Sequence, residues 1–481
     1  MADADPKISA DSMQGLLDRQ RAAFMADLPV SLDVRHDRLT RAVALLVDHG
    51  AALCDAMSED FGHRSREQSM LTDVNAAINA LKHARKHAKT WMKSERRPVQ
   101  FPLGLLGARA TVEYQPKGVV GIIAPWNFPI VLAFSPLAGV FAAGNRAMLK
   151  PSEFTPVTSD LIAKLVPDYF DPTELAVVTG GPDVGKAFSE LAFDHLIYTG
   201  STNVGRHVMA AAAKNLVPVT LELGGKSPVI VSDSANIAQT AERVVLGKMM
   251  NAGQICLAPD YLLVSAAKEG ELVDQIKASA SALYPTLLDN DDYSSVVNDR
   301  HYDRLQGHVD DARAKGAEVI VVNPANEDFA SSNKRKMPLH IIRNVRDEMT
   351  VMQEEIFGPL LPIKATSGTA DAVDYVNAHD RPLGLYYFGS DSDEERRVLD
   401  TTISGGVTVN DVIFHVAMED LPFGGVGPSG IGSYHGIEGF RAVSHAKSIY
   451  RQPKLDIAKL AGMKPPYGKT TAKTIARDFK K

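Results

Sequence analysis

The chain has 481 residues, a length that fits two or three domains of ordinary size. Hydrophobic residues make up 45%, charged residues 23%, and the net charge is −6, a balance typical of globular proteins that gives no attraction for nucleic acid or an anionic membrane. The two cysteines cannot form a disulfide framework, so we expect a reducing, cytoplasmic location.

The N-terminal part, from about Ser9 to Lys93, predicts amphipathic helices, after an acidic start that lacks the apolar core of a signal peptide. Cys54 lies among apolar neighbours and is interpreted as a core thiol. His83 and His87 have the four-residue spacing of metal ligands. The lysines and arginines around them would repel a cation, so we expect a solvated basic face and no metal site.

A stretch without charged residues runs from Gly118 to Asn145 and is long enough to span a bilayer. Pro125, Pro129 and Pro136 interrupt it, and no second span accompanies it. It is therefore interpreted as a strand, a polar turn and a buried helix of a protein outside the membrane.

Strands and helices alternate from there on. The first run has strands at 119–124, 147–150, 175–179, 195–199 and 217–221, with helices at 131–143, 156–165 and 202–214. A second run contains strands at 228–231, 261–265, 318–322, 361–364, 385–388 and 406–410. Repeated units of this length predict an α/β fold of two doubly wound, mainly parallel lobes with a cleft between them.

Two segments stand apart from this alternation. Residues 94–116 are rich in Pro, Gly and Arg and are expected to leave the main domain. The tail from Lys464 to Lys481 is strongly basic and is expected to be solvated.

Cys256 lies in Asn251-Ala252-Gly253-Gln254-Ile255-Cys256-Leu257, between a predicted helix and the strand at 261–265. A thiol on such a turn can face a cleft and act as a nucleophile. Most free cysteines are only small buried hydrophobes, so both interpretations stay open on this segment alone.

Glu222 ends an apolar strand and precedes Gly224 and Gly225. The carboxyl end of such a strand faces the crevice where α/β sheets bind ligands. Desolvation there would raise its pKa and suit it to general-base catalysis. A buried structural salt bridge explains the same position equally well.

Asn127 lies in Pro125-Trp126-Asn127-Phe128-Pro129, where two prolines fix the turn before a helix. Its neutral amide is a suitable oxyanion donor. The alternative is an asparagine that caps the following helix.

A dinucleotide site has one poor and one better candidate. Gly425–Gly430 spells G-x-G-x-x-G but follows no strand and contains a proline, so it fails the structural context. Gly200, Ser201 and Gly205 follow a strand and open a helix, whose N-terminus would favour a pyrophosphate, although an ordinary turn remains possible. Lys150 and Glu153 end a neighbouring strand and would hold a ribose, unless they form a solvated surface pair.

These motifs together resemble the aldehyde dehydrogenase superfamily over about residues 10–450. They are Pro125–Pro129, Lys150–Glu153, Tyr198–Ser201, Glu222–Lys226, the Cys256 segment and Glu354–Pro359, and the separation of Cys256 from Glu222, 256 − 222 = 34, agrees as well. Gln254–Tyr261 and Leu421–Gly427 are most similar to the class 3 branch, and within it to bacterial coniferyl aldehyde dehydrogenases.

The resemblance implies oxidation of an aldehyde, aromatic or cinnamyl such as coniferyl aldehyde, to the acid. Cys256 would be the nucleophile, Asn127 with the Cys256 backbone N–H the oxyanion donor, and Glu222 the base for the water that hydrolyses the thioester. The remaining roles it implies concern the cofactor: Glu355 at the nicotinamide ribose, Phe357 and Trp126 near the nicotinamide, Lys150 and Glu153 at the adenine ribose, and Gly200, Ser201 and Gly205 at the pyrophosphate.

The resemblance also implies NAD as cofactor, with NADP possible, and an aldehyde dehydrogenase-like fold. The expected domains are a Rossmann-like NAD(P)-binding domain (1–96 and 118–225), a catalytic domain (226–424), and a small β oligomerisation flap with the tail (97–117 and 440–481). We expect a homodimer, a small-molecule aldehyde substrate, and no metal, nucleic acid or membrane partner.

Three rival functions stay open: a dehydrogenase that transfers the acyl group to CoA, a cysteine hydrolase without redox chemistry, and a non-catalytic, crystallin-like protein. Glu222 argues against the first. The lack of a histidine in the Cys256 segment argues against the second, and the intact set of Cys256, Glu222 and Asn127 argues against the third.

Overall fold

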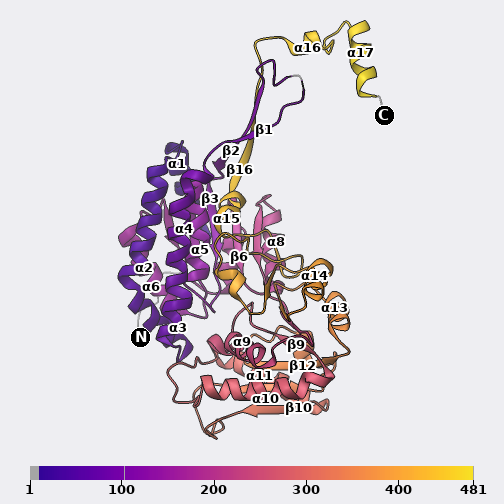
Figure 1. The fold of residues 1–481 in the computed structure, drawn as a ribbon. Coiled ribbons are helices and arrows are strands. Elements are labelled where there is room, and N and C mark those ends of the chain that lie inside the picture. The colour runs from indigo at the N-terminus through magenta and orange to yellow at the C-terminus, as the bar shows by residue number, and fades with distance from the viewer. Residues whose placement is uncertain (1–9, 102, 480–481) are drawn as a thin grey trace.

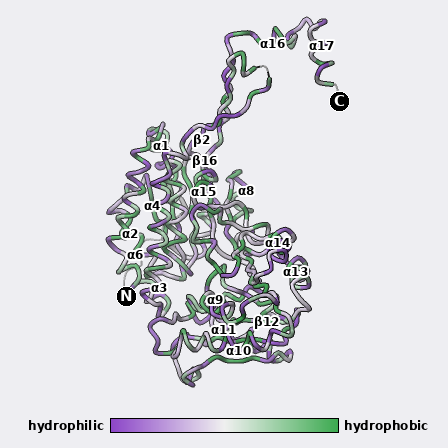
Figure 2. The backbone as a smooth tube through the Cα atoms, in the orientation of Figure 1, coloured by the Kyte–Doolittle hydropathy of each residue, from purple (hydrophilic) through white to green (hydrophobic). Residues whose placement is uncertain are grey.

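The computed structural model describes residues 10–101 and 103–479 and shows two α/β lobes with a helical layer on one side and a long projecting arm (Figure 1). The acidic start and the last two lysines of the tail lie outside these residues. In Figure 2 hydrophilic residues follow the outer side of the helical layer, whereas hydrophobic segments gather inside the lobes.

The helical layer confirms the predicted N-terminal helices. It consists of α1 (Ala10–Ala26), α2 (Leu32–Phe61), α3 (Arg66–Ser69), the π-helical turn η1 (Met70–Val74) and α4 (Asn75–Trp91). Cys54 is 1% exposed inside this layer, which confirms the interpretation as a core thiol.

The first lobe is built on a six-stranded sheet in the order β15-β7-β6-β3-β4-β5, parallel except for β15. Its strands are β3 (Val119–Ile123), β4 (Arg146–Lys150), β5 (Leu175–Val177), β6 (His195–Thr199), β7 (Val219–Glu222) and β15 (Gly430–Ile431). Its helices are α5 (Val131–Ala143), α6 (Pro156–Tyr169), α7 (Pro182–Ser189), α8 (Thr202–Ala213) and α15 (Gly436–Ala442).

The uncharged stretch forms β3 and α5, as the sequence predicts. Helix α5 is apolar on all sides and almost wholly buried. It ends at Gly144, which adopts a left-handed conformation with a φ of 89° that glycine takes up without strain. No helix within residues 10–101 and 103–479 is long and apolar enough to cross a membrane.

The second lobe carries a seven-stranded sheet in the order β10-β11-β12-β9-β8-β13-β14, in which only the β10–β11 pair is antiparallel. Its strands are β8 (Pro228–Val231), β9 (Tyr261–Ser265), β10 (Glu318–Val322), β11 (Leu339–Arg343), β12 (Leu360–Thr366), β13 (Gly384–Phe388) and β14 (Gly406–Val409). Its helices are α9 (Ile237–Met249), η2 (Met250–Gly253), α10 (Ala266–Leu283), α11 (Asp299–Ala314), α12 (Thr350–Gln353), α13 (Thr369–Asn377), α14 (Ser392–Thr401) and η3 (Phe414–Ala417).

The arm is a three-stranded antiparallel sheet of β1 (Glu95–Arg97), β2 (Arg109–Pro116) and β16 (Ser444–Arg451), in the order β1-β2-β16. At its far end lie α16 (Ile457–Leu460) and, in the basic tail, α17 (Lys469–Asp478) (Figure 1). The two lobes and the β flap thus confirm the predicted fold class, whereas the exact domain boundaries stay a prediction.

Candidate active site

The Cys256 segment makes a sharp left-handed turn after α9. Asn251, Ala252 and Gly253 all have positive φ, of 48°, 51° and 75°. A Cβ at Gly253 would lie 2.4 Å from the carbonyl oxygen of Gly358, so only glycine fits. Cys256 follows as a partly exposed residue between the buried Ile255 and Leu257.

The environment of Cys256 keeps the thiol protonated in the cofactor-free chain. Burial raises its pKa to about 12, and the charges of Glu355 and Glu222 add to this rise. The backbone N–H groups of Cys256 and Leu257 act in the opposite direction. A thiolate nucleophile, as the resemblance implies, therefore needs a further positive influence at this site.

Asn127 is buried and lies against the Cys256 segment. Its side-chain Nδ2 donates to the carbonyl of Gln254 at 3.1 Å. Its backbone carbonyl oxygen accepts hydrogen bonds from Arg64 Nη1 at 2.9 Å and from Asn251 Nδ2 at 3.1 Å. An amide nitrogen carries two donors, so one N–H of Asn127 is left for a substrate oxygen.

Asn127 does not cap helix α5, which removes the alternative interpretation. The N–H groups of Ile130 and Val131 at the start of α5 donate instead to Asp73 Oδ1, at 3.0 and 2.5 Å. Asp73 also lies 3.3 Å from Arg64 Nη2, and both side chains are fully buried. The helical layer thus fixes the Asn127 turn from behind.

Glu222 is the last residue of β7 and is 2% exposed. Neither of its carboxylate oxygens has a hydrogen-bond partner among the described residues, so the salt-bridge interpretation fails. Burial raises the pKa of the carboxyl well above its usual range. A buried carboxyl without a structural partner has the properties of a general base.

Glu355 shares these properties. Burial, and next the charge of Asp260, raise its pKa to about 8. Its Oε1 is buried without a partner among the residues described, so it can accept a ligand hydroxyl. A Cβ on Gly224 would lie 2.0 Å from Oε2, so any larger residue there would displace the Glu355 carboxylate.

The predicted pyrophosphate turn lies next to Glu222. Ser201 caps α8 by accepting from the Val204 N–H at 3.4 Å, and Gly200 donates its N–H to the Glu222 carbonyl at 3.0 Å. Gly205 is buried in α8, where a Cβ would lie 2.6 Å from Leu223. The N-terminus of α8 therefore faces the crevice at the carboxyl ends of β6 and β7.

Lys150 is 2% exposed at the end of β4, so it does not belong to a solvated pair. Its Nζ lies 3.0 Å from Glu153 Oε2 and 3.0 Å from the Pro151 carbonyl. The Glu153 side chain remains 33% exposed, so a ligand can reach this pair.

Aromatic rings of the two lobes contact one another next to Asn127 and Glu355 in the chain. The centroid of the Trp126 ring lies 5.3 Å from that of Phe357 and 5.1 Å from that of His301. Phe357 has a φ of 49°, an unfavourable value for a bulky residue that the surrounding structure must impose. Together with the unpartnered Glu355 oxygen and the N-terminus of α8, these rings form a set of groups that fits a nicotinamide dinucleotide.

The sequence did not single out Arg64, Asp73 or His301, because nothing in their neighbourhoods marks them. The interpretation of His83 as part of a solvated face was wrong. Its side chain is 17% exposed and lines a cavity, because α4 turns this face toward the segment before α15. No group of residues that could hold a metal ion occurs in the described part of the chain.

The model of the aldehyde dehydrogenase family matches residues 6–449. The chain belongs to the aldehyde dehydrogenase family. It is 57% identical to a probable coniferyl aldehyde dehydrogenase of Caulobacter vibrioides, with 98% of this chain and 97% of the relative covered. It is 54% identical to the coniferyl aldehyde dehydrogenase of Pseudomonas sp. strain HR199, with 96% and 95% covered.

Among solved structures, the substrate-bound state of Staphylococcus aureus AldH is similar, with a TM-score of 0.90, 34% identity, and 97% of this chain and 99% of that chain covered. The aldehyde dehydrogenase fold and family are therefore shown. The protein is an oxidoreductase that acts on aldehydes and uses NAD or NADP. The cysteine hydrolase and the crystallin-like protein are excluded as its function.

Proposed function

We propose that this aldehyde dehydrogenase oxidises an aromatic or cinnamyl aldehyde, such as coniferyl aldehyde, to the free carboxylic acid. The single observation that carries the choice of water as acyl acceptor is Glu222, a buried carboxyl whose two oxygens have no partner among the described residues. The substrate class is supported by the names of the relatives at 57% and 54% identity.

Cys256 provides the nucleophile. The S–H bond of Cys256 breaks and its proton leaves to solvent water, the thiolate sulfur bonds to the aldehyde carbon, and the C=O electron pair moves onto the oxygen. The resulting oxyanion is held by the free N–H of Asn127 and the backbone N–H of Cys256. The hydrogen bonds from Arg64 and Asn251 to the Asn127 carbonyl keep this donor in place. Pre-positioned donors stabilise the developing charge without reorganisation.

Glu222 acts in the second half of the reaction. Its carboxylate takes a proton from water, whose oxygen bonds to the thioester carbon while the C–S bond breaks and Cys256 is released. A CoA-acylating enzyme would not need such a base, so Glu222 favours hydrolysis over transfer to CoA.

We propose NAD as the preferred cofactor, which when bound supplies a hydride acceptor. Glu355 would bind the nicotinamide ribose, and Trp126 and Phe357 would pack near the ring. Gly200, Ser201 and Gly205 would hold the pyrophosphate. Lys150 and Glu153 would bind the adenine ribose, where the Glu153 carboxylate disfavours a 2′-phosphate.

The test is an assay of NADH and NADPH formation with benzaldehyde, coniferyl aldehyde and hexanal. We expect the highest kcat/KM with coniferyl aldehyde and NAD, a free acid as product without CoA, and no activity in Cys256→Ala. Turnover of Cys256→Ala near that of the wild type would contradict the nucleophile, and a strict need for CoA would contradict hydrolysis by water.

We also propose that two copies associate through the arm and that the enzyme is cytoplasmic. Apolar side chains are exposed on the arm and its tip, as shown by Phe101 at 79%, Leu105 at 81% and Leu455 at 51%. A second copy of the chain would cover them. Both cysteines are free, in accord with a reducing compartment.

A further inference from the structure

A cavity lies between α4, α5, the first sheet and the segment that precedes α15. Its empty space, mouth included, is about 380 Å³, and its interior has room for about one ordered water. Several of its lining side chains can carry or transfer a proton. They are His83, Thr220, Glu419, Tyr434 and His435.

The inner end of this cavity adjoins the catalytic groups. Thr220 lines the cavity, and side chains two apart on a strand share a face, so Glu222 lies on the same face of β7. Tyr434 is 3% exposed and belongs to the apolar cluster against which Cys256 packs. Burial, and next the charges of Glu222, Cys256 and Glu419, raise the pKa of the Tyr434 hydroxyl, so these three groups are within electrostatic reach of it.

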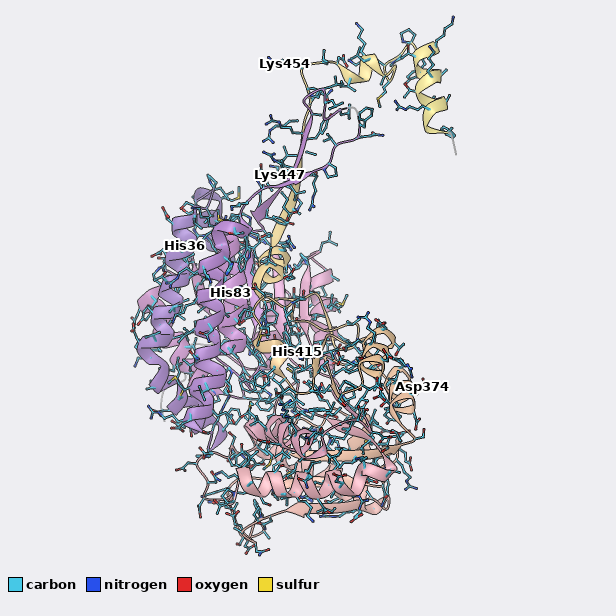
Figure 3. All side chains as sticks on the ribbon, viewed as in Figure 1. His36, His83, Asp374, His415, Lys447 and Lys454 are labelled. Atoms are coloured by element: carbon cyan, nitrogen blue, oxygen red, sulfur yellow. The ribbon has the colours of Figure 1, made fainter. Side chains whose placement is uncertain are left out.

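The outer end of the cavity reaches the surface. His83 Nε2 lies 3.1 Å from Asp420 Oδ1, and the two side chains are 17% and 79% exposed. Glu419, the neighbour of Asp420, is partly buried and lines the cavity. In Figure 3 His83 lies on α4, on the side of the helical layer that faces the middle of the molecule.

The wall between the two ends is strained and polar. His435 has a φ of 89°, and the next residue, Gly436, has no room for a Cβ, which would lie 2.4 Å from the Glu419 carbonyl. The imidazole of His435 is buried, and its Nδ1 has no partner among the residues described. Strain and an unpaired buried polar atom at one place are costly features that mark functional sites.

We propose that the proton taken up by Glu222 leaves the active site through this cavity, by way of Tyr434 and Glu419, to His83 and Asp420 at the surface. This inference rests on the proposed role of Glu222 as base. Asn127, Glu355 and Gly200, which are proposed to bind substrate and cofactor, do not line this cavity, so it offers a path that these ligands do not block.

The proton balance of the step is closed. When the O–H bond of water breaks, the proton goes to the Glu222 carboxylate, the oxygen bonds to the thioester carbon, and the C–S electron pair returns to Cys256. Glu222 must lose that proton before the next turnover. Tyr434 donates its hydroxyl proton toward Glu419 and receives the one from Glu222, and Glu419 passes the excess proton to His83 or to solvent.

The charges around Glu419 suit this transfer. Burial, and next the charge of Asp420, raise the pKa of Glu419 to about 7, so it can take up and release a proton near neutrality. His435 stays neutral there, because burial and the charges of His415 and His83 lower its pKa to about 4. Burial also lowers the pKa of His83, against the opposing charge of Asp420.

The test is Glu419→Gln in the full-length enzyme with saturating aldehyde and NAD. We expect steady-state turnover at pH 7 to fall by about 10-fold or more. The first-turnover burst of NADH and kcat/KM for aldehyde should stay unchanged, and KM should fall together with kcat, because only the later proton release is affected. Imidazole added as a small proton carrier should restore part of the turnover. Tyr434→Phe, which keeps the ring packing, should behave in the same way.

Glu438→Gln is the matched control, since Glu438 lies on α15 near the cavity but does not line it. Wild-type turnover of both Glu419→Gln and Tyr434→Phe from pH 6 to 9 would overturn the proposal, and so would a burst slowed in proportion to turnover. Glu222→Gln distinguishes failure of the proposed base from failure of the proposed exit path. If Glu222→Gln also keeps wild-type turnover, the assignment of Glu222 as base is wrong. If Glu222→Gln is the only one of the three variants that loses turnover, only the exit path is wrong.

Discussion

At the scale of single residues, the active site is crowded with groups that burial keeps uncharged. The pKa of Cys256 is raised to about 12 and that of Glu355 to about 8, and the pKa of Glu222 also lies well above its usual value. Ionised Glu355 and Glu222 would each disfavour the thiolate, whereas burial is the main cause of the raised pKa of both carboxyls. In the cofactor-free enzyme the thiol proposed as the nucleophile is therefore protonated near neutral pH.

This state predicts the reactivity of Cys256 toward iodoacetamide in the cofactor-free enzyme. A thiol is neutral when protonated, so a raised pKa means that the thiolate fraction keeps growing as pH rises. The rate of alkylation should increase about tenfold per pH unit from pH 7 to 9. This rate is measured by mass spectrometry of the peptide that contains Cys256. Cys256→Ser is the control, because the remaining Cys54 is 1% exposed. A rate that levels off below pH 8 would show a depressed pKa and contradict the prediction.

The candidate residues could be predicted from the sequence, but not the choice between their alternatives. Whether Asn127 caps a helix depends on Asp73, which is 54 positions away and takes the N–H groups of α5. Whether Glu222 is paired depends on which side chains the fold brings to β7. These are long-range packing facts, and no local pattern encodes them.

At the scale of elements, the helical layer holds the turn that contains Asn127. The buried pair of Arg64 and Asp73 joins the Asn127 carbonyl on one side to the start of α5 on the other. Asp73 lies on the π-helical turn η1, an irregularity that often occurs at functional sites. The Arg64 guanidinium also lies 4.9 Å from the Phe128 ring, within reach of a cation–π contact.

Arg64→Met should therefore destabilise the enzyme and slow its chemistry. Removal of one partner of a buried ion pair lowers the free energy of unfolding by about 3–5 kcal/mol, measured by urea denaturation. The NADH burst should slow as well, because the Asn127 carbonyl loses a donor. Arg66→Met is the control: its pair with Asp55 has side chains 56% and 65% exposed, so the loss should be at most about 1 kcal/mol. Equal stability losses in the two variants would contradict this role.

Most elements of the two lobes follow from the sequence because their hydrophobic runs are bounded by clear turn residues. The predicted helix at 131–143 and the strands at 195–199 and 228–231 match the structure to the residue. Strand β15 was missed, since its two residues carry no pattern and pair with β7 only through the tertiary fold. Strand β11 was missed too. It pairs antiparallel with β10, which forms one edge of the second sheet.

At the scale of the whole molecule, the arm is the feature that a single chain does not explain. It leaves the compact lobes as a narrow sheet, and the basic tail extends beyond it. Figure 3 labels Lys447, on β16, and Lys454, just after the end of that strand. Strand β16 pairs with β2 on one side only, so its other edge is open to a further strand. Exposed apolar residues and an open strand edge are both features that association of copies would cover.

The dimer proposed for the arm predicts a change of mass when its apolar tip is made charged. Leu105 is 81% exposed between β1 and β2, so Leu105→Asp should leave the folded chain intact but disfavour burial of this side chain against a second copy. We expect sedimentation velocity to show a dimer for the wild type and a shift toward monomer, by about tenfold or more in Kd, for Leu105→Asp. The matched control is Leu216→Asp, which charges an apolar residue that is 90% exposed on the first lobe, away from the arm. A monomeric wild type would contradict association through the arm. Equal shifts in both variants would contradict it as well, because an effect of charge alone does not depend on where the aspartate is placed.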